Sequence, residues 1–494
     1  MRFSFCIADP LNSLTLLIDF GSTFTKITAV DLSTSEVVGR SQAPSTVLTD
    51  VREGLVEALI TLHERHALFE RQPAGLDVLE GKVVFASSSA AGGLRMVVIG
   101  LVPSLTVEAA NLAALGAGAK VVGSLAFKLE EKAIQEIASL RPDMVLLTGG
   151  TNGGDSRTIL HNARLLARFP LSVPIVVAGN RVVAGEVCEI LRGSGKEVRC
   201  AENVMPQSGK LAVESAREEI RKLFMERITH AKGLDRIKEV VPVILPTPMA
   251  VLMAVVLGAE GVETGKGWGE MLVVDVGGAT TDVHSIGYGQ PSGPNTIVQG
   301  LPEPFAKRTV EGDLGIRYNA ATLVGRVGLD NLETEFRTAF PEFAVSREEL
   351  TRYLEEISQE TSRVPREKWH YAVDALLARV AVDLAVERHV GRRERVFTRE
   401  GEAWVHYGKD LRETPTLIGT GGVFVYNPYA SHILFPGARG NADLQILRPR
   451  NPKAFIDSSY LLYAVGLLSE SHPAVAARIF QAHMRPVGLR QSGG

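Results

Sequence analysis

The sequence predicts an α/β protein built from two similar lobes, because two short segments of the same design lie about half the chain apart. Each segment follows an apolar strand, at Leu14 to Ile18 and at Met271 to Val274, opens with an aspartate and turns on glycine. The composition agrees, since 45% of the 494 residues are hydrophobic, 22% are charged and 48 are glycine, as in globular α/β proteins. The length exceeds one domain, and typical domain sizes predict about three domains.

The two segments are candidate phosphate-binding hairpins. Their sequences are Asp19-Phe20-Gly21-Ser22-Thr23-Phe24-Thr25-Lys26 and Asp275-Val276-Gly277-Gly278-Ala279-Thr280-Thr281-Asp282. Such a hairpin aligns backbone N–H groups and hydroxyls around an anion, and glycine has no Cβ to block the approach. An aspartate suits a magnesium ion or an attacking water, because Mg²⁺ takes oxygen ligands. Two hairpins facing each other across a cleft would hold a nucleoside triphosphate from both sides, whereas either one alone is as readily a plain tight turn.

Three further segments complete the set. Leu417-Ile418-Gly419-Thr420-Gly421-Gly422 is an apolar strand ending in a glycine turn against which an adenosine can lie, although glycine after a strand is commonplace. The other two are predicted helices, beginning at Leu245-Pro246-Thr247-Pro248-Met249-Ala250-Val251 and at Tyr460-Leu461-Leu462-Tyr463-Ala464-Val465-Gly466-Leu467-Leu468. Each helix alone would be an ordinary core helix. The occurrence of all five segments in one order favours a nucleotide site.

That order resembles the superfamily of actin, hexokinase and heat-shock chaperone ATPases. The resemblance implies a two-lobed actin-like ATPase fold, in which duplicated RNase H-like lobes close on Mg-ATP and helices cross the hinge. It also implies ATP and Mg²⁺ as cofactors and ATP hydrolysis as the activity. The domains expected are the first part of lobe one at 14–94, an inserted α/β unit at 95–240, the end of lobe one with a crossing helix at 241–260, lobe two with a helical subdomain at 265–450 and a return crossing helix at 455–480.

Site roles follow from this resemblance and from the chemistry of phosphoryl transfer. Asp275 is the first candidate for orienting or deprotonating the attacking water and Asp19 for ordering a magnesium-bound water, so both are candidate catalytic and metal residues. Asp282 is expected to cap its turn. Pro246-Thr247-Pro248 has no acidic residue where several relatives place one near the hinge, so slow turnover is expected. Lys26 either adds positive charge or, by strand alternation, points into solvent. The residues expected to bind the nucleotide are Gly21, Ser22, Thr23, Lys26, Gly277, Gly278, Thr280, Thr281, Gly419, Thr420, Gly421 and Gly422.

The unit at 95–240 has its own alternation of strands and helices, which predicts a parallel sheet with ligand-type loops at its carboxyl edge. Its glycine turn from Thr148 to Asp155 lacks the GxGxxG spacing of a dinucleotide site. This turn is either structural, within a docking domain, or a site for an anion or partner. The turn from Ser87 to Gly93 is either beside the nucleotide or a plain connection between strand and helix.

Polar segments in the second lobe have several interpretations. The stretch from Lys307 to Arg317 is either a cap over the γ-phosphate or an interface patch. A helix from Tyr371 to His389 has apolar residues at helical spacing, and His389 is expected to be a charge at its C-terminus. The basic run from Gly391 to Arg395 is expected to be a solvated helix end.

Charge, cysteine and hydropathy patterns narrow the setting. The formal net charge is −3, and no basic tract of nucleic-acid type is present. The three cysteines, Cys6, Cys188 and Cys200, form no CxxC pair and are expected to be reduced thiols in a cytoplasm. No apolar run reaches the roughly 18 residues of a membrane span. The segment before Leu14 lacks the apolar core of a secretion signal and is expected to be a loose extension.

The resemblance becomes specific along nearly the whole chain. The sequence is similar to the GlmL (also called MutL) family, which accompanies adenosylcobalamin-dependent glutamate mutase and related mutases or aminomutases. This resemblance implies an ATP-driven reactivating chaperone whose partners are mutase subunits, with no nucleic acid, no membrane and a possible homo-oligomer. The DNA mismatch-repair protein of the same name has an unrelated fold. The segments that carry the similarity are 16–23, 88–94, 177–180, 202–206, 273–285 and 309–315.

Two other classes stay open. A small-molecule kinase, or an ATP-dependent hydantoinase or carboxylase type of the same fold, needs a general base, and Asp19, Asp275 or Asp313 would supply one. ATP turnover without a small acceptor, stimulated by a B12 enzyme, would separate the chaperone from these enzymes. A filament-forming actin relative has no positive sign in the sequence.

Overall fold

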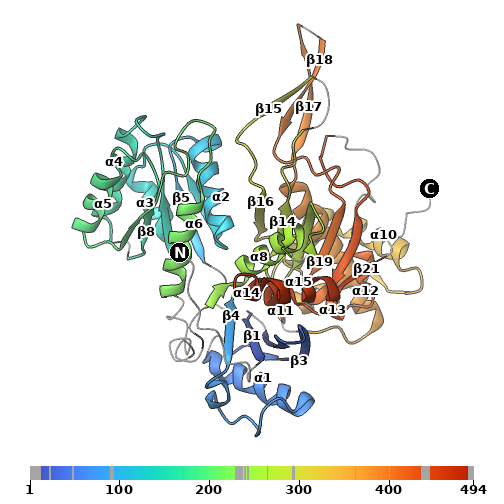
Figure 1. Cartoon of the computed structure of the whole chain (residues 1–494). Helices are drawn as coiled ribbons and strands as arrows, with labels where there is room; N and C mark the ends of the chain where they lie inside the picture. Colours follow the sequence, from blue (N-terminus) through green and yellow to red (C-terminus); the bar gives the residue numbers. More distant parts are fainter. Residues whose placement is uncertain are drawn as a thin grey trace. The chain divides into compact units, whose positions relative to one another are not determined.

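The computed structural model (Figure 1) describes residues 13–21, 24–46, 49–89, 94–170, 172–227, 237, 241, 244–263, 265–291, 295–361, 363–399, 401–434 and 445–487. The expected N-terminal extension therefore lies outside the described residues. The chain forms two compact units. Unit 1 comprises Met1–Ala254, Gly300–Pro302 and Tyr463–Ala476, and unit 2 comprises Val255–Gln299, Glu303–Leu462 and Ala477–Gly494.

The first sheet, in unit 1, has the strand order β10-β4-β1-β2-β3. Strands β1 and β2 pair antiparallel, as do β2 and β3, whereas β4 lies parallel to both β1 and β10. Both faces of β1 are buried, as expected for the central strand of a covered sheet. Asp50 caps helix α1, accepting a 2.9 Å bond from the Arg52 amide. The bounds are β1 Leu14–Phe20, β2 Phe24–Asp31, β3 Glu36–Pro44, α1 Val51–His66, η1 Asp77–Leu79, β4 Val83–Ser88 and β10 Ile244–Pro246.

The second sheet, in unit 2, repeats this design in the order β16-β14-β13-β19-β20, with β21 added at the edge. Strands β13, β14 and β16 are antiparallel neighbours, and β19 is parallel to both β13 and β20. Each strand thus has a counterpart of the same order and direction in the first sheet. The duplication confirms the predicted fold class, an α/β actin-like ATPase fold with two RNase H-like lobes. The bounds are β13 Met271–Val276, β14 Thr281–Ile286, β16 Ala306–Glu311, β19 Thr416–Thr420, β20 Lys453–Asp457 and β21 Met484–Val487.

Between β4 and β10 the chain forms a separate, all-parallel sheet in the order β6-β5-β7-β8-β9. The strand order reverses between β5 and β7, which is where open α/β sheets carry ligands or loops of functional interest. The bounds of this inserted unit are β5 Arg95–Ile99, η2 Pro103–Val107, α2 Glu108–Gly116, β6 Lys120–Leu125, α3 Glu131–Ser139, β7 Met144–Leu147, α4 Arg157–Arg168, β8 Ile175–Val177, α5 Ala184–Gly193, β9 Val198–Cys200 and α6 Glu214–Arg227. The helices α3 and α6 were not anticipated from the sequence.

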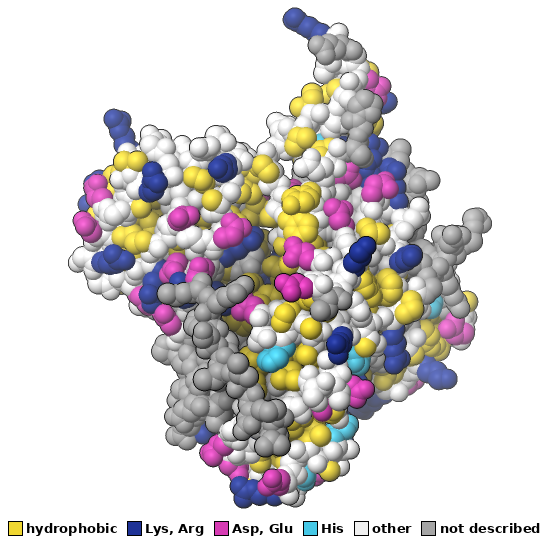
Figure 2. All heavy atoms as spheres, in the orientation of Figure 1, with side chains coloured by type: hydrophobic (Ala, Val, Ile, Leu, Met, Phe, Trp, Pro, Cys, Tyr) yellow, Lys and Arg dark blue, Asp and Glu magenta, His cyan; other side chains and the backbone are white. Residues whose placement is uncertain are grey.

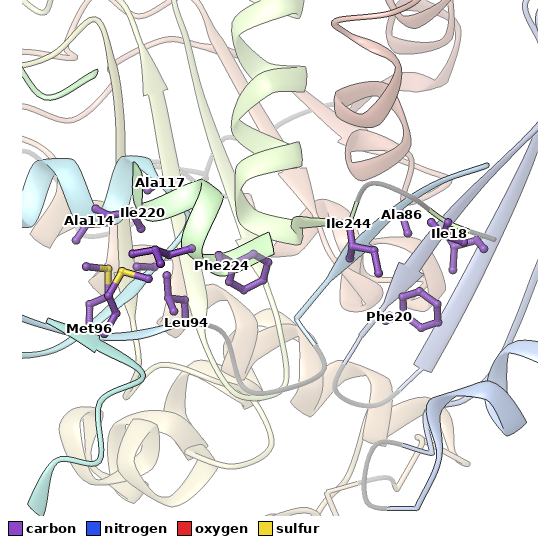
Figure 3. Close-up of a cluster of buried hydrophobic side chains, with 14 of the residues drawn as sticks. Ile18, Phe20, Ala86, Leu94, Met96, Ala114, Ala117, Ile220, Phe224 and Ile244 are labelled. Carbon is purple, nitrogen blue, oxygen red and sulfur yellow. The ribbon is translucent and has the colours of Figure 1, made fainter. Parts of the chain in front are cut away.

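The inserted sheet has a different core on each face, because successive strand residues point to opposite sides. Met96 and Val98 pack with α2 and α6 in a cluster that is continuous with the core of the first sheet. Figure 3 shows this cluster, with Met96 beside Ile220 and with Phe20 among the strands of the first sheet. Val97 and Ile99 instead face α3, α4 and α5 in a second cluster. The inserted unit therefore shares one of its two cores with the rest of unit 1.

The basic run at 391–395 is a strand, so its interpretation as a helix end was wrong. β17 pairs antiparallel with β18, which pairs parallel with β15; Figure 1 shows β17 and β18 projecting from the rest of unit 2. The guanidinium of Arg393 lies 4.2 Å from the ring centre of Trp404 on the neighbouring strand, a cation–π contact between β17 and β18. The remaining bounds in unit 2 are β11 Gly261–Val262, β12 Gly265–Lys266, β15 Thr296–Gln299, α9 Ala320–Val327, α10 Leu329–Ala339, α11 Arg347–Gln359, α12 Lys368–His389, β17 Arg392–Thr398, β18 Gly401–Tyr407, α13 Gly422–Tyr426 and η4 Ala430–His432.

Three further helices complete the described elements. Helix α8 (Thr247–Glu260) starts where the sequence predicted a crossing helix, and α14 (Leu462–Leu468) lies within the segment predicted for the return helix. Helix α15 (Pro473–His483) follows α14. Within unit 1, the Tyr463 hydroxyl lies 2.9 Å from the Thr28 hydroxyl and donates to the Leu17 carbonyl at 3.3 Å. In the part of the chain that the structure describes, no helix has both the length and the apolar character of a membrane span.

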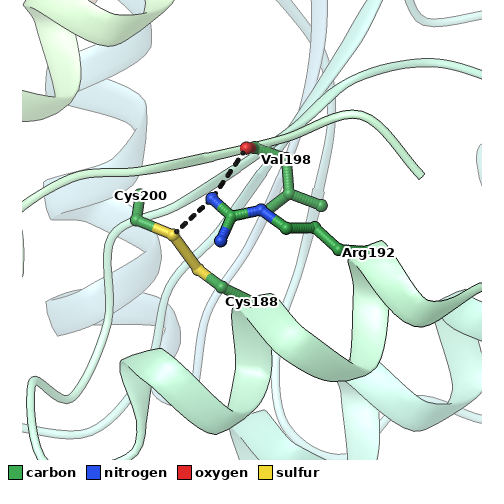
Figure 4. Close-up of a disulfide and its surroundings, with 4 residues drawn as sticks. All are labelled: Cys188, Arg192, Val198 and Cys200. Carbon is green, nitrogen blue, oxygen red and sulfur yellow. Dashed lines mark hydrogen bonds between the residues drawn. A yellow bond between two sulfur atoms is a disulfide. The ribbon is translucent and has the colours of Figure 1, made fainter. Parts of the chain in front are cut away.

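The cysteines correct a prediction. Cys188 on α5 and Cys200 at the end of β9 form a disulfide, with their Cα atoms 6.9 Å apart (Figure 4). Arg192 donates to the Val198 carbonyl and to the Cys200 sulfur in the same place. The expectation of reduced thiols failed because α5 packs beside β9, a tertiary contact that a spacing of 12 residues does not reveal. Cys6 lies outside the described residues.

Candidate functional site

The two predicted hairpins make the same turn. The Gly21 amide donates to the Phe24 carbonyl at 3.1 Å, and the Gly277 amide donates to the Thr280 carbonyl at 2.9 Å. A Cβ added at Gly21 would lie 2.6 Å from that Phe24 oxygen, and one at Gly277 would lie 3.1 Å from the Thr280 oxygen. Gly21 therefore has no room for a Cβ, and Gly277 has only tight space for one. Ser22 and Thr23 lie outside the described residues.

Asp19, the residue before the last of β1, is held on three sides within unit 1. Its Oδ1 accepts a 2.7 Å hydrogen bond from the Thr247 hydroxyl and a 3.0 Å bond from the Ser87 hydroxyl. Its Oδ2 lies 3.2 Å from the ammonium of Lys26, its cross-strand partner on β2. Asp19 is 1% exposed. The strands β1, β4 and β10 run parallel, so their carboxyl ends bring these groups to one edge.

This arrangement fits a carboxylate that orders water around a magnesium ion. Two hydroxyl groups hold the Asp19 carboxylate in place. Its Oδ2 faces Lys26, which is partly buried, with 24% of its side chain exposed. Mg²⁺ in nucleotide sites usually takes one or two carboxylates and completes its shell with waters and phosphate oxygens. Among the described residues, no cluster of three or more His, Cys, Asp or Glu side chains is placed to bind a metal.

The segment that follows β16 braces the second hairpin by hydrogen bonds to its carbonyl groups. The Gly277 carbonyl accepts from the Ile316 amide at 3.2 Å, and the Gly278 carbonyl accepts from the amides of Arg317 and Tyr318 at 2.9 and 3.0 Å. Asn319 also donates to the Ala279 carbonyl at 2.9 Å. Because its carbonyl groups accept these hydrogen bonds, the turn is held in one conformation before any ligand binds. The stretch from Lys307 to Arg317, expected to be a cap or an interface patch, supplies β16 and then this brace.

A buried ion pair supports the brace. The Arg317 guanidinium donates to both carboxylate oxygens of Asp374 on α12, at 3.2 and 2.5 Å. The Tyr353 hydroxyl on α11 donates to Asp374 at 3.0 Å. Burial is the largest influence on the Asp374 carboxyl and raises its pKa, and burial likewise raises the pKa of Tyr353. The helices that carry Asp374 and Tyr353 are thereby linked, through Arg317, to the Gly278 backbone.

Asp275 and Asp282 are direct cross-strand partners, so their side chains point to the same face of the sheet. Asp282 does more than cap its turn. It accepts from the Thr280 hydroxyl at 3.1 Å and forms a buried ion pair with Arg308 of β16, whose Nε and Nη2 lie 2.9 and 2.5 Å from Oδ1. Arg308 therefore neutralises the carboxylate that is the cross-strand partner of Asp275.

His389 was expected to be a helix-end charge, and this was wrong. Its side chain is fully buried, with Nδ1 2.9 Å from the Thr309 hydroxyl and Nε2 2.8 Å from the Ser285 hydroxyl. Burial lowers its pKa well below 6.5, and the charges of Lys307 and Lys409 lower it further. The ring is a neutral bridge between α12 and the sheet. The sequence pattern could not show this, because the hydroxyls come from two other strands.

In the predicted adenosine turn, the residues from Gly419 to Gly421 pack closely against their neighbours, whereas Gly422 has open space beside it. A Cβ at Gly419 would lie 2.5 Å from the Phe424 ring, and the Thr420 hydroxyl donates to the buried Asp457 at 3.0 Å. Gly421 has a φ of +109°, and a Cβ there would lie 2.3 Å from the Val276 carbonyl and 3.0 Å from Asp275 Oδ1. Gly422 has open space around its added Cβ. The turn thus packs directly against the second phosphate hairpin.

The hydroxyl of Thr281, another predicted phosphate ligand, is already engaged. Thr281 is fully buried and donates to the Leu314 carbonyl at 2.7 Å. Gly278, in contrast, has only ordinary contacts near its added Cβ, 3.6 Å from the Arg317 side chain. The side of Gly278 that an added Cβ would occupy is therefore less crowded than that of Gly277.

Asp313, a candidate base for a kinase, is committed to arginines. Arg388 donates to its two oxygens at 2.7 and 3.0 Å, and Arg326 donates at 2.7 Å. The hydrogen bond from Arg388 is the largest influence and lowers the pKa of Asp313 to about 2. A carboxylate of such low basicity is a poor general base near neutral pH.

Several supporting residues were not singled out from the sequence. Thr247 at the start of α8 holds Asp19, and Asp457 caps the turn before α14 by accepting from the Leu461 and Leu462 amides at 2.7 and 3.1 Å. Thr247 directly follows β10, and Asp457 is the last residue of β20. Their partners lie far away in the sequence, so local pattern alone did not identify them.

The sequence is similar to one protein family over nearly its whole length. The family model described as MutL protein matches residues 15–484. Protein MutL of Clostridium tetanomorphum is 43% identical over 475 residues, which cover 95% of this chain and 98% of that protein. Among solved structures, nucleotide-free acetone carboxylase has a TM-score of 0.40 and 12% identity over 93% of this chain and 70% of that one. Xylulose kinase of Bifidobacterium adolescentis has a TM-score of 0.29 and 11% identity over 97% and 96% of the two chains.

The fold assignment rests on the matching strand orders of the two sheets, since these structural similarities are too low to carry it. The family assignment rests on the match of the family model and on the relative at 43% identity, both of which extend over nearly the whole chain. The chain belongs to the MutL family.

Proposed function

We propose that this protein is a Mg-dependent ATPase that reactivates an adenosylcobalamin-dependent mutase of the glutamate mutase or aminomutase type. The observation that carries the ATPase part is the repeated Asp-x-Gly hairpin, with Asp19 and Asp275 at equivalent strand ends of two sheets of the same topology. Membership of the MutL family supports the mutase as partner. Since such a mutase is a metabolic enzyme, we expect the cytoplasm as the place of action.

The proposed chemistry relies on positioning and charge more than on covalent help. The backbone N–H groups around Gly21 and Gly278 bind phosphate oxygens, and the Lys26 ammonium adds positive charge beside Asp19. Asp275 accepts a proton from the attacking water while Arg308 neutralises the neighbouring Asp282. The magnesium ion, when bound, neutralises charge on the phosphates, and the Asp19 carboxylate orients water molecules at that position.

Turnover is expected to be slow. Thr247 contacts Asp19 at the start of α8, at the hinge position where the sequence comparison anticipated an acid. A hydroxyl orients the carboxylate but cannot accept a proton from water near neutral pH. Slow hydrolysis suits a protein that acts once on each damaged partner.

The reactivating role has a physical rationale. A mutase that has lost the adenosyl group retains a damaged cobalamin in a closed site, and opening that site requires free energy. Closure of a two-lobed ATPase around its nucleotide supplies such energy through a large conformational change. We assign contact with the mutase to the inserted unit at 95–240.

The test is a rescue assay with purified components. Glutamate mutase and an aminomutase are each inactivated with a cobalamin that lacks the adenosyl group and are then given free adenosylcobalamin, Mg-ATP and this protein. Recovery of mutase activity is expected, and a non-hydrolysable ATP analogue should not sustain repeated cycles. Failure to restore either enzyme, together with phosphorylation of a small metabolite, would replace this proposal with a kinase.

A further inference from the structure

The carboxyl edge of the inserted sheet displays two large apolar side chains to solvent. Phe127, two residues after β6, is 59% exposed, and Val182, between β8 and α5, is 72% exposed. Neither side chain belongs to the buried clusters of this unit. Both residues lie at the loop edge of a parallel sheet, where α/β proteins carry binding residues. This position indicates a role in binding.

The backbone of Phe127 is held in a conformation that its side chain disfavours. Its φ is +66°, in the left-handed region that bulky residues rarely adopt. Its amide donates to the Leu101 carbonyl at 3.2 Å, and its carbonyl accepts from the buried Asn162 at 3.0 Å. Asn162 also accepts from the Leu129 amide at 2.9 Å. A buried asparagine thus clamps the loop that presents the ring, as expected where strain is retained for function.

Val182 is presented in the same way by Asn180. This buried asparagine accepts from the amides of Val182 and Gly153, both at 3.1 Å, and donates to the Gly154 and Asp155 carbonyls, both at 3.2 Å. The glycine turn after β7 is therefore pinned to the loop after β8. These hydrogen bonds are those of a structural turn, one of the two alternatives predicted for this segment. Gly153 is exposed and leaves room for another chain to approach its backbone closely.

A third buried asparagine completes the support. Asn203 donates to the Gly150 carbonyl at 2.9 Å and to Asn152 at 3.0 Å, and it accepts from the Met205 amide at 3.0 Å. The amide groups of Asn162, Asn180 and Asn203 are thus committed to backbone or side-chain partners inside the protein. The edge is a rigid surface, and rigid surfaces lose little entropy on binding.

The exposed charges on this edge are of both signs. Lys128 and Arg181 are positive and Asp155 is negative, and all three are exposed. Figure 2 shows apolar and charged side chains interspersed on the visible face of the molecule. A phosphate backbone or an anionic membrane needs a concentrated positive surface. The edge instead matches a largely apolar protein surface with little net charge.

We propose that Phe127 and Val182 are the anchors by which the inserted unit docks on the mutase, through an apolar, nearly neutral surface of that enzyme. This inference rests on the proposed function and specifies the contacting face. Aromatic anchors with a fixed backbone carry a large share of the binding energy in protein interfaces. The glycine turn between them lets the partner's backbone come close.

The test uses the full-length chain and whichever mutase the unchanged protein rescues. In the double variant Phe127→Asn/Val182→Thr, asparagine accepts a positive φ and threonine keeps the shape of valine. We expect an unchanged or higher Tm and unchanged basal ATP turnover, but affinity for the mutase reduced at least about tenfold. A stabilised protein that has lost its partner would show that Phe127 is kept for binding.

The matched control is Val298→Thr/Phe397→Asn, which alters a valine and a phenylalanine exposed by 62% and 81% on β15 and β17. Its affinity should stay within about twofold of the unchanged protein. Equal mutase affinity for the Phe127/Val182 variant and the unchanged protein would overturn the assignment, as would an equal loss in the control. If the unchanged protein binds and rescues no mutase, the proposed function itself fails, and this is seen without any variant.

Discussion

The hydroxyl of Thr247 donates a 2.7 Å hydrogen bond to Asp19, a residue 228 positions earlier in the chain. Thr247 begins α8, and Asp19 lies near the end of β1, so the contact connects the start of a predicted crossing helix with the carboxylate of the first phosphate hairpin. A displacement of the start of α8 would therefore also shift the Asp19 carboxylate. The contact also explains how a threonine stands where an acid was anticipated: it orients the carboxylate and leaves the charge to Asp19.

Removing this hydroxyl should slow hydrolysis more than it weakens binding. Thr247→Val keeps the shape but leaves Asp19 Oδ1 with one hydroxyl donor, Ser87. We expect kcat for ATP to fall about tenfold, because a misoriented carboxylate orders water poorly, with little change in KM. Steady-state ATP turnover measures both. Thr247→Ser retains the hydroxyl and should keep most of the activity; equal kcat in the valine variant would show that the contact is only structural.

Asp275 should be required for hydrolysis and not for binding. Asp275→Asn preserves the shape and removes the charge, so ATP should still bind while turnover falls about 100-fold or more. Equilibrium binding and phosphate release are the two measurements. The control is Asp313→Asn, since the pKa of Asp313 is lowered to about 2 by its arginine partners. Undiminished turnover in the Asp275 variant, or an equal loss in the control, would contradict the role given to this hairpin.

Two glycines test ligand contact without disturbing the fold. An added Cβ meets only an ordinary 3.6 Å contact at Gly278 and open space at Gly422. Gly278→Ala and Gly422→Val should therefore fold normally, yet each should weaken ATP affinity at least about tenfold by filling the space of phosphate or adenosine. Calorimetric binding and a thermal melt measure affinity and folding. Gly325→Ala, also in open space, is the control.

The space around Gly421 excludes the most obvious substitution at the adenosine turn as a test of ligand contact. From the sequence alone, Gly421→Val would have been chosen to block adenosine. In the structure, its Cβ would lie 2.3 Å from the Val276 carbonyl, and the φ of +109° strains any other residue. Such a variant is expected to unfold locally, so a loss of ATP binding there would say nothing about the ligand. Normal folding and affinity of Gly422→Val would show that this segment is only a strand end.

Stability should fall as the pH is lowered below about 6.5. The folded state keeps His389 neutral, because burial lowers its pKa well below the 6.5 of the unfolded chain. In this range the unfolded state binds a proton that the folded state does not, so the free energy of unfolding decreases by up to about 1.4 kcal/mol per pH unit for this residue. Urea unfolding at pH 7.5 and 5.5 measures the change.

The matched variant for this pH effect is His389→Gln, which cannot titrate. It should be less stable than the unchanged protein at pH 7.5, because a hydrogen bond to Ser285 or Thr309 is lost, but its stability should depend less on pH. The buried His284, whose pKa burial also lowers, retains its own contribution in this variant. An unchanged pH slope would show that His389 is charged in the folded protein.

Local sequence signals located the strands and turns of the site well. The apolar runs before Asp19 and Asp275 predicted β1 and β13, and the glycines after them predicted turns whose geometry leaves no room for a Cβ at Gly21. These features depend on neighbours within a few residues, so their information is contiguous. The duplication of strand order was visible in outline for the same reason, since each lobe repeats the pattern.

What the sequence by itself determined is the order of its parts: two aspartate hairpins, an adenosine-type turn and a parallel α/β insertion, because each is encoded by strand periodicity and glycine placement over a short stretch. Only the tertiary structure decided what the polar side chains do. Thr247 holds Asp19, Arg308 pairs with Asp282, and His389 is neutral, because their partners come from distant strands and helices. Burial and pairing arise when those elements pack, and no local pattern records them.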